Sequence, residues 1–128
     1  MSLAIYAAVA GGGALGAMLR YSVSLLTGAG FFGINGPVAT LIVNVCGSSL
    51  MGLFAGLVAG GLMVPEAWRA FIAIGLLGAL TTFSSFSLDA GALFQKQGLG
   101  MAVVYIALSL CLSLGSFALC YWFVRLPS

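Results

Sequence analysis

The chain has 128 residues, of which 62% are hydrophobic and only 5% are charged. A soluble domain carries about 25% charged residues and needs them to stay dispersed in water, so this composition excludes a soluble protein and predicts an all-α membrane protein in a lipid bilayer. With no histidine and two carboxylates, the chain has almost no groups for acid–base or metal-assisted catalysis. An enzyme is therefore the least expected class, and no nucleic-acid partner is expected.

Four apolar stretches nearly fill the chain. A helix needs about 20 apolar residues to cross the hydrocarbon core of a bilayer. Stretches of that kind lie approximately at 3–26, 38–63, 68–94 and 99–124. We therefore expect a single four-span transmembrane domain over residues 1–128. The first residues lack the basic flank of a cleaved signal peptide, so they are interpreted as the start of the first span.

Glycines recur at four-residue spacing in the first two spans, as Gly12 and Gly16 and as Gly52, Gly56 and Gly60. In lipid, such ridges of small residues let helix backbones approach one another closely. Because four spans alone make a thin bundle, the ridges also predict an oligomer.

Basic residues are balanced across the membrane. In a four-span chain, Arg69 and Arg125 fall on one side and Arg20 and Lys96 on the other, so two minus two leaves no excess. An excess of basic residues is what sets the orientation of a membrane protein. Without one the chain can insert both ways round, which favours an antiparallel homodimer with its two-fold axis in the membrane plane. A heterodimer with an oppositely oriented partner fits the same charges.

The stretch LGALTTFSSFSLD places five hydroxyl groups near the middle of the third span: Thr81, Thr82, Ser84, Ser85 and Ser87. Two arrangements are open. The helix can break near the bilayer midplane, after Gly78, so that the freed carbonyls coordinate a cation and the hydroxyls satisfy the stranded groups. Alternatively, the helix is continuous and the hydroxyls bond back to preceding carbonyls.

Other polar and aromatic residues lie in the second, third and fourth spans. Phe83 and Phe86 either pack as apolar rings or present their positive edges inward, where they can stabilise a small anion without a strong charge. Asn44 adds an amide to the second span, where a polar side chain is a functional candidate. Beginning at Tyr105, a row of hydroxyls recurs every four residues on one face of the fourth span and includes Ser109.

Two charged residues fall near the ends of spans. Arg20 either snorkels to the interface or draws anions into a vestibule, and Asp89 is interpreted as structural or peripheral, able to pair with a basic group near the mouth. The residues alone thus predict a small homo-oligomeric pore that favours a small, strongly hydrated anion.

Four segments together resemble the Fluc (CrcB-type) fluoride channels. They are GAMLR in the first span, TLIVN in the second, GALTTFSSFSLD in the third and the Tyr–Ser–Ser row in the fourth. The resemblance implies an antiparallel, dual-topology homodimer with two fluoride pathways in a prokaryotic inner or plasma membrane. Such a channel lets cytoplasmic fluoride leak out passively.

The resemblance also implies roles for particular residues. The pore residues would be Asn44, Phe83, Phe86, Tyr105, Ser109, Ser113, Thr40 and Thr82. Arg20 would lie in an aqueous vestibule, and the backbone carbonyls of Gly78 and Thr81 would hold a structural sodium ion (Na+) on the dimer axis. No organic cofactor is implied. The chain departs from the family pattern at Ala79, where a second glycine is common, and at Asp89, where glutamate is frequent.

Two other classes share some of these features. A small multidrug-type proton-coupled transporter has the same size and topology, but it needs a titratable group inside the membrane, and the first two spans contain no Asp, Glu or His. A non-transporting assembly subunit explains the glycines but leaves the row of hydroxyls without a purpose.

Overall fold

The computed structural model describes residues 2–28 and 36–125, and every regular element in these ranges is helical. The elements are α1 (Leu3–Leu26), α2 (Gly36–Ala59), α3 (Glu66–Arg69), the π-helical segment η1 (Ala70–Leu77), α4 (Gly78–Leu80), α5 (Phe83–Gln97) and α6 (Leu99–Phe123). Four stretches, namely α1, α2, Glu66–Gln97 and α6, are long and apolar enough to cross a membrane. The prediction of an all-helical protein with four membrane-spanning stretches is confirmed.

The ends of two spans differ from the expected boundaries. Helix α2 ends at Ala59 instead of residue 63, because Gly61 adopts a positive φ of 103° that stops the helix. The next amide, of Leu62, then closes on the carbonyl of Leu57 at 3.0 Å. The third span runs from Glu66 to Gln97. It turns into α6 at Gly98, whose φ of 87° a residue with a side chain rarely adopts. Most of the expected first connection, residues 27–37, lies outside the described residues.

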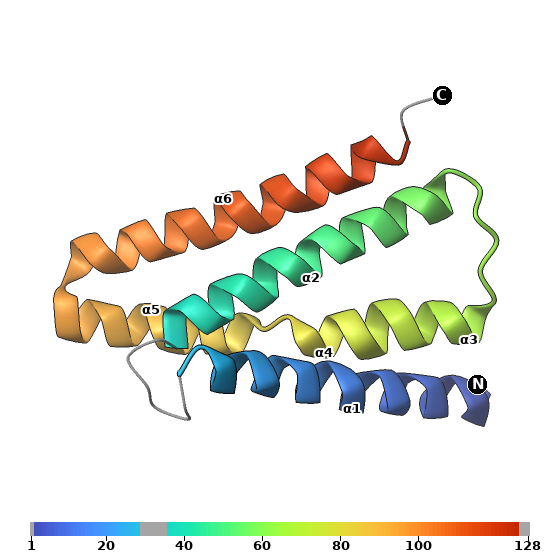
Figure 1. Ribbon diagram of the computed structural model, residues 1–128, viewed down its shortest axis with the longest axis horizontal. Helices are drawn as coiled ribbons and strands as arrows, with labels where there is room; N and C mark the ends of the chain where they lie inside the picture. Colours follow the sequence, from blue (N-terminus) through green and yellow to red (C-terminus); the bar gives the residue numbers. More distant parts are fainter. Residues whose placement is uncertain (1, 29–35, 126–128) are drawn as a thin grey trace.

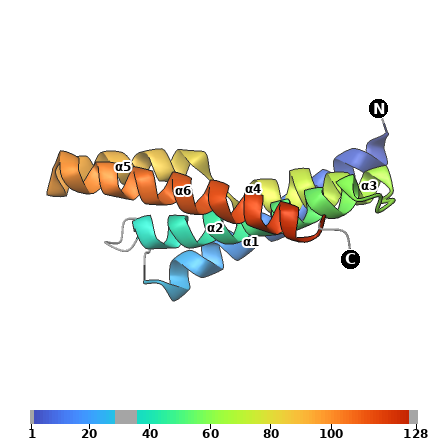
Figure 2. The same ribbon diagram turned by 90° about the horizontal axis from the view of Figure 1, so that it is seen from above.

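The helices pack as two pairs. Helix α6 runs alongside α2, and α1 runs alongside the first half of the third span, while α5 reaches across to α6 (Figure 1). Both termini lie at one end of the molecule, as an even number of spans requires. Seen from above, the molecule is elongated, and α5 and α6 extend together at one end (Figure 2).

Small residues allow the helices of each pair to approach closely. A Cβ atom on Gly12 or Gly16 would overlap backbone carbonyls of η1, and one on Gly52 or Gly56 would overlap backbone carbonyls of α6. These four glycines therefore form the close contacts that the spacing predicted. Gly60 does not, because it lies beyond the end of α2 and would meet only carbonyls of its own chain segment.

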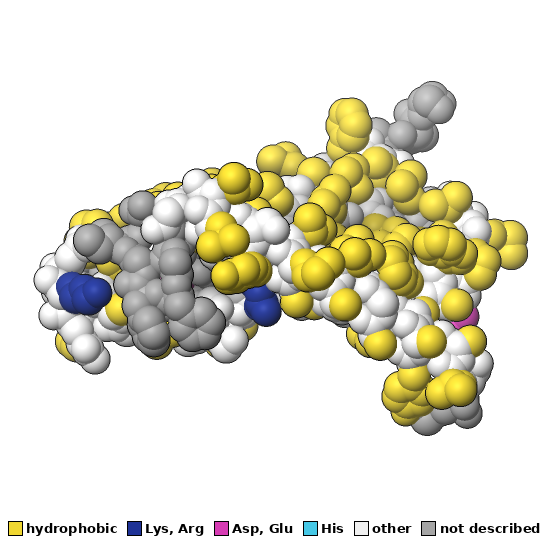
Figure 3. Space-filling view, turned by 60° about the horizontal axis from the view of Figure 1, so that its bottom comes forward, with side chains coloured by type: hydrophobic (Ala, Val, Ile, Leu, Met, Phe, Trp, Pro, Cys, Tyr) yellow, Lys and Arg dark blue, Asp and Glu magenta, His cyan; other side chains and the backbone are white. Residues whose placement is uncertain are grey.

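The surface is apolar and the core is thin. Val43, Leu77 and Leu80 form the central cluster of buried side chains, whereas large apolar residues are exposed along every span. Hydrophobic side chains predominate in the right-hand part of the view in Figure 3, and the charged side chains in view appear only as isolated points. At the end of α6, Arg125 donates a hydrogen bond from Nη1 to the Tyr121 hydroxyl at 2.9 Å. This pattern suits a protein whose solvent is the acyl chains of a bilayer.

Candidate functional site

The third span is interrupted between α4 and α5. Helix α4 ends at Leu80, Thr81 and Thr82 have extended backbones (φ −77°, ψ 156° and φ −153°, ψ 120°), and α5 begins at Phe83. The Thr81 amide still bonds to the Leu77 carbonyl at 3.1 Å. The Thr82 amide, which in a continuous helix would bond to the carbonyl of Gly78, instead turns toward α2.

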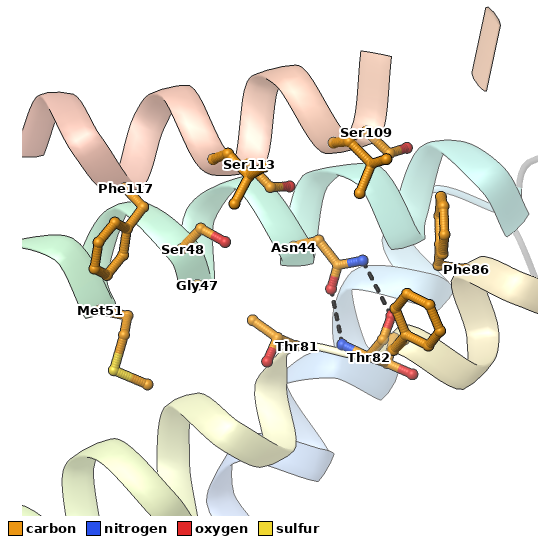
Figure 4. Close-up of a pocket in the computed structure, with 13 residues that line it drawn as sticks. Asn44, Gly47, Ser48, Met51, Thr81, Thr82, Phe86, Ser109, Ser113 and Phe117 are labelled. Carbon is orange, nitrogen blue, oxygen red and sulfur yellow. Dashed lines mark hydrogen bonds between the residues drawn. The ribbon is translucent and has the colours of Figure 1, made fainter. Parts of the chain in front are cut away.

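Asn44 of α2 binds the backbone at this interruption. Its Oδ1 accepts a hydrogen bond from the Thr82 amide at 2.7 Å, and its Nδ2 donates to the Thr82 carbonyl at 3.1 Å (Figure 4). A side-chain amide combines an acceptor and a donor, so one asparagine can bond to both the N–H and the C=O of a single residue. Asn44 thus replaces the helical partners that Thr82 has lost, and its amide nitrogen keeps a second hydrogen for another acceptor.

The hydroxyl groups around the interruption have different partners. Thr81 and Ser87 each donate to the carbonyl four residues earlier at 3.0 Å, which is the arrangement expected in a continuous helix. Thr82 instead caps α5, because its Oγ1 accepts from the Ser85 amide at 3.2 Å and donates to the Ser85 hydroxyl at 3.1 Å. Thr82 was predicted as a pore residue, and its hydroxyl hydrogen is engaged in this cap.

A cavity of about 300 Å³ lies beside the interruption, between α2, α5 and α6 (Figure 4). Six of the predicted pore residues line it: Asn44, Thr82, Phe83, Phe86, Ser109 and Ser113. The sequence reasoning missed Ser48 and Phe117, which also line it. Each lies one helical turn beyond a predicted residue, Ser48 after Asn44 and Phe117 after Ser113, so continuing the same helix faces would have found both.

Ser109 is a buried polar group of this cavity, and its hydroxyl lacks a partner among the described residues. Its side chain is only 4% exposed, and its Oγ has no hydrogen-bond partner within the described ranges. Leaving a buried hydroxyl unpaired costs about 1–3 kcal/mol. A polar guest in the cavity would remove that cost by forming a hydrogen bond with the Ser109 hydroxyl.

The two phenylalanines lie at different depths. Phe86 is 8% exposed, and its ring centroid lies 5.4 Å from that of Phe83 and 5.6 Å from that of Tyr105. Phe83 is 75% exposed although it lines the cavity. One ring is therefore enclosed by the single chain, and the other stands at its open side.

Comparisons with known proteins give the family. The family described as "CrcB-like protein, Camphor Resistance (CrcB)" matches residues 7–121, from α1 to near the end of α6. This chain belongs to the CrcB-like family. The resemblance noted in the sequence is therefore confirmed at the level of the family.

Curated relatives of this CrcB-like chain carry the name "Fluoride-specific ion channel FluC". One from Rhodospirillum centenum is 48% identical over 111 residues, which cover 84% of this chain and 85% of the relative. One from Shewanella amazonensis is 49% identical over 106 residues, covering 83% and 84%. A third, from Saccharophagus degradans, is 44% identical over 115 residues, covering 90% and 85%.

In this CrcB-like chain, two predicted pore residues lie outside the cavity. Thr40 Oγ1 donates to Asp89 Oδ2 at 2.6 Å, and the Tyr105 hydroxyl donates to the same oxygen at 3.4 Å. Asp89 was interpreted as structural or peripheral, and these two bonds favour the structural alternative: within residues 2–28 and 36–125 its carboxylate meets hydroxyl groups and not a basic group. Asp89 lies in α5, the element that approaches α6, and its carboxylate is bonded by hydroxyls from α2 and α6.

Arg20 and Gly78 lie away from the cavity lining, whereas Thr81, the other expected sodium ligand, is part of it. Arg20 is half-buried in α1, and its vestibule role remains a prediction. Gly78 is exposed, and its carbonyl has lost its helical partner because the Thr82 amide bonds to Asn44.

Replacing Asn44 with alanine should destabilise the protein by about 1–2 kcal/mol, because the amide and carbonyl of Thr82 lose their partners. We expect a lower unfolding midpoint in mixed micelles and faster hydrogen exchange at the Thr82 amide. The matched control is Ser49→Ala on the same helix, whose hydroxyl donates to the Val45 carbonyl at 2.8 Å. Equal midpoints for the two variants would contradict the role of Asn44.

Proposed function

We propose that this protein is a fluoride-selective channel that lets fluoride leave the cytoplasm passively across a bacterial inner membrane. Its relatives, 44–49% identical, carry the name of such a channel, and their family is one of channels and not of enzymes. The observation that carries the proposal is the cavity beside the interrupted helix, where the buried Ser109 hydroxyl has no partner among the described residues.

The hydrogen-bond donors of the cavity are suited to bind a small anion and to release it again. Ser109 offers a hydroxyl hydrogen, Asn44 keeps one amide hydrogen, and Phe86 can present its positive ring edge. None of the 13 residues that line the cavity is charged. Conduction needs binding that replaces the hydration shell yet releases the ion, and uncharged donors meet both needs better than a buried cation would.

A proton-coupled transporter is the rival that the structure bears on most directly. Such a transporter needs a titratable group inside the membrane, and Asp89 in α5 provides a carboxylate that the sequence reasoning had placed at a span end. That carboxylate, however, lies outside the cavity lining. The names of the relatives and the uncharged lining both favour a channel.

The pathway is proposed to be completed by a second, antiparallel copy of the chain. Three observations support this: Phe83 is 75% exposed, large apolar side chains are exposed on every span, and the basic residues are balanced between the two sides. A second copy would cover Phe83 and close the open side of the cavity. Because a two-fold axis repeats each feature, the dimer would contain two fluoride pathways.

A structural Na+ ion at the dimer axis fits the interrupted backbone. Unwound carbonyls are ligands that membrane proteins use for Na+. The carbonyl of Gly78 has lost its helical partner, and Thr81 continues the chain at the interruption in an extended conformation. Because each chain offers few such oxygens, the ion would bind where two copies bring theirs together. Its contribution would be to hold the two interruptions at a fixed separation.

Purified protein in liposomes should release fluoride rapidly, release little chloride, and need no proton gradient. We expect this selectivity because the uncharged donors of a small cavity can replace the hydration shell of a small anion better than that of a larger one. Halide-selective electrodes measure both fluxes after the membrane potential is collapsed. Phe86→Ala should slow fluoride release by roughly tenfold through loss of the ring edge.

The matched control for Phe86→Ala is Phe94→Ala, on the same helix but outside the cavity lining, which should release fluoride at the rate of the unchanged protein. Both variants must elute at the same size as that protein. Equal fluoride and chloride release by the unchanged protein would contradict the proposed selectivity, and a normal rate for Phe86→Ala would show that the ring is only packing.

Copies of the chain should occupy both orientations in native membranes, because the basic residues set no preference. A cysteine introduced at the exposed Ser2 can be labelled with a membrane-impermeant reagent in intact cells and again after permeabilisation. We expect about half of the label before permeabilisation and the rest afterwards. Labelling of every copy from the same side would contradict the antiparallel dimer.

A further inference from the structure

A second polar cluster lies next to the cavity and is built from the same three helices. Thr40 of α2, Asp89 of α5 and Tyr105 of α6 meet at one carboxylate oxygen, with distances of 2.6 Å and 3.4 Å from the two hydroxyls. We call these three residues the carboxylate cluster. All three lie inside the stretches that are long and apolar enough to span a membrane.

The carboxylate cluster lies about one helical turn from the cavity on each helix. Thr40 precedes Asn44 by four residues on α2, and Tyr105 precedes Ser109 by four residues on α6. The ring of Tyr105 also lies 5.6 Å from that of Phe86, which lines the cavity. An ion that leaves the cavity along this face of α6 therefore meets the hydroxyl of Tyr105 next.

The hydroxyls of the two sites differ in what they can offer. A carboxylate only accepts hydrogen bonds, so the hydrogens of Thr40 and Tyr105 both point to Asp89. Ser109 has no such partner within the described part of the chain, so its hydrogen is available to a guest. A passing anion can accept a hydrogen bond from Ser109 directly. To accept one from Tyr105 or Thr40, it must first displace the Asp89 carboxylate from that hydroxyl.

We propose that Asp89 is a positioning residue that competes with the passing anion for the hydroxyl hydrogens of Thr40 and Tyr105, and thereby limits how tightly the anion is held beside the cavity. This inference rests on the proposed function as a fluoride channel. Its physical basis is that an anion gains each of these bonds only by breaking a charge-assisted one. Fast conduction needs such weak binding, because an ion held by every available donor leaves slowly.

The test measures fluoride efflux from liposomes over a range of fluoride concentrations for the unchanged protein and Asp89→Asn. The neutral amide has the same shape but is a weaker acceptor, so the two hydroxyls turn to the anion more readily. We expect both the half-saturating fluoride concentration and the maximal efflux rate to fall by roughly tenfold. A purely structural role would lower the maximal rate and leave the half-saturating concentration unchanged.

A second experiment tests whether Asp89 acts through the two hydroxyls or whether its charge acts directly on the ion. In the variant Thr40→Val with Tyr105→Phe, the hydrogens that Asp89 holds are gone. Adding Asp89→Asn there should change the half-saturating concentration by less than about twofold, because interacting residues are not additive. A change as large as in the unchanged background would overturn the inference and show that the carboxylate acts on the ion itself.

The matched control is Glu66→Gln, which removes the other carboxylate of the chain, at the exposed start of α3. It should leave both efflux parameters unchanged, and Asp89→Glu should stay near the unchanged protein because it keeps an anionic acceptor. If Asp89→Asn does not assemble, Asp89→Ser carries the same prediction. No fluoride efflux from the unchanged protein would overturn the proposed function and this inference together. Normal efflux with an unaltered half-saturating concentration in Asp89→Asn would overturn the inference alone.

Discussion

The pair of hydrogen bonds between the Asn44 amide and the Thr82 backbone is the interaction on which the site depends. In a bilayer, an interrupted helix leaves amides and carbonyls that water cannot satisfy, so the chain must supply partners from elsewhere. Asn44 supplies both partners from α2, which lets α4 end and α5 begin within two residues. The same contact brings α2 beside the interruption and so sets one wall of the cavity.

Close packing makes this contact possible. Gly47 lies three residues after Asn44 on α2 and faces the methyl group of Thr81. A Cβ atom on Gly47 would overlap this methyl group. The absence of a side chain at that position brings α2 near enough for the amide to reach Thr82. With few buried side chains, the fold relies on such glycine contacts and on the surrounding lipid more than on a large core.

Features that depend on periodicity along one helix were predicted from the sequence. Contacts that depend on a neighbouring helix were not. Apolar length was enough for four spans, and four-residue spacing placed Ser109 and Ser113 on one face beside a shared cavity. Which side chains would meet the Asp89 carboxylate depended on how helices approach one another, information that spacing along one helix does not hold. The partners of Asp89 were missed for that reason, since it bonds to side chains 49 and 16 residues away.

The most direct measurement of the central claim is the distance between bound fluoride and the side-chain nitrogen of Asn44. The chain has two asparagines, Asn35 and Asn44, so an Asn35→Ser variant labelled with asparagine that carries ¹⁵N only in its side chain reports on the Asn44 amide by ¹⁹F–¹⁵N dipolar dephasing in bilayers. If this amide donates a hydrogen bond to the ion, the dephasing should be strong and consistent with a separation of about 3 Å. No dephasing at saturating fluoride would contradict the claim that this amide donates to the ion.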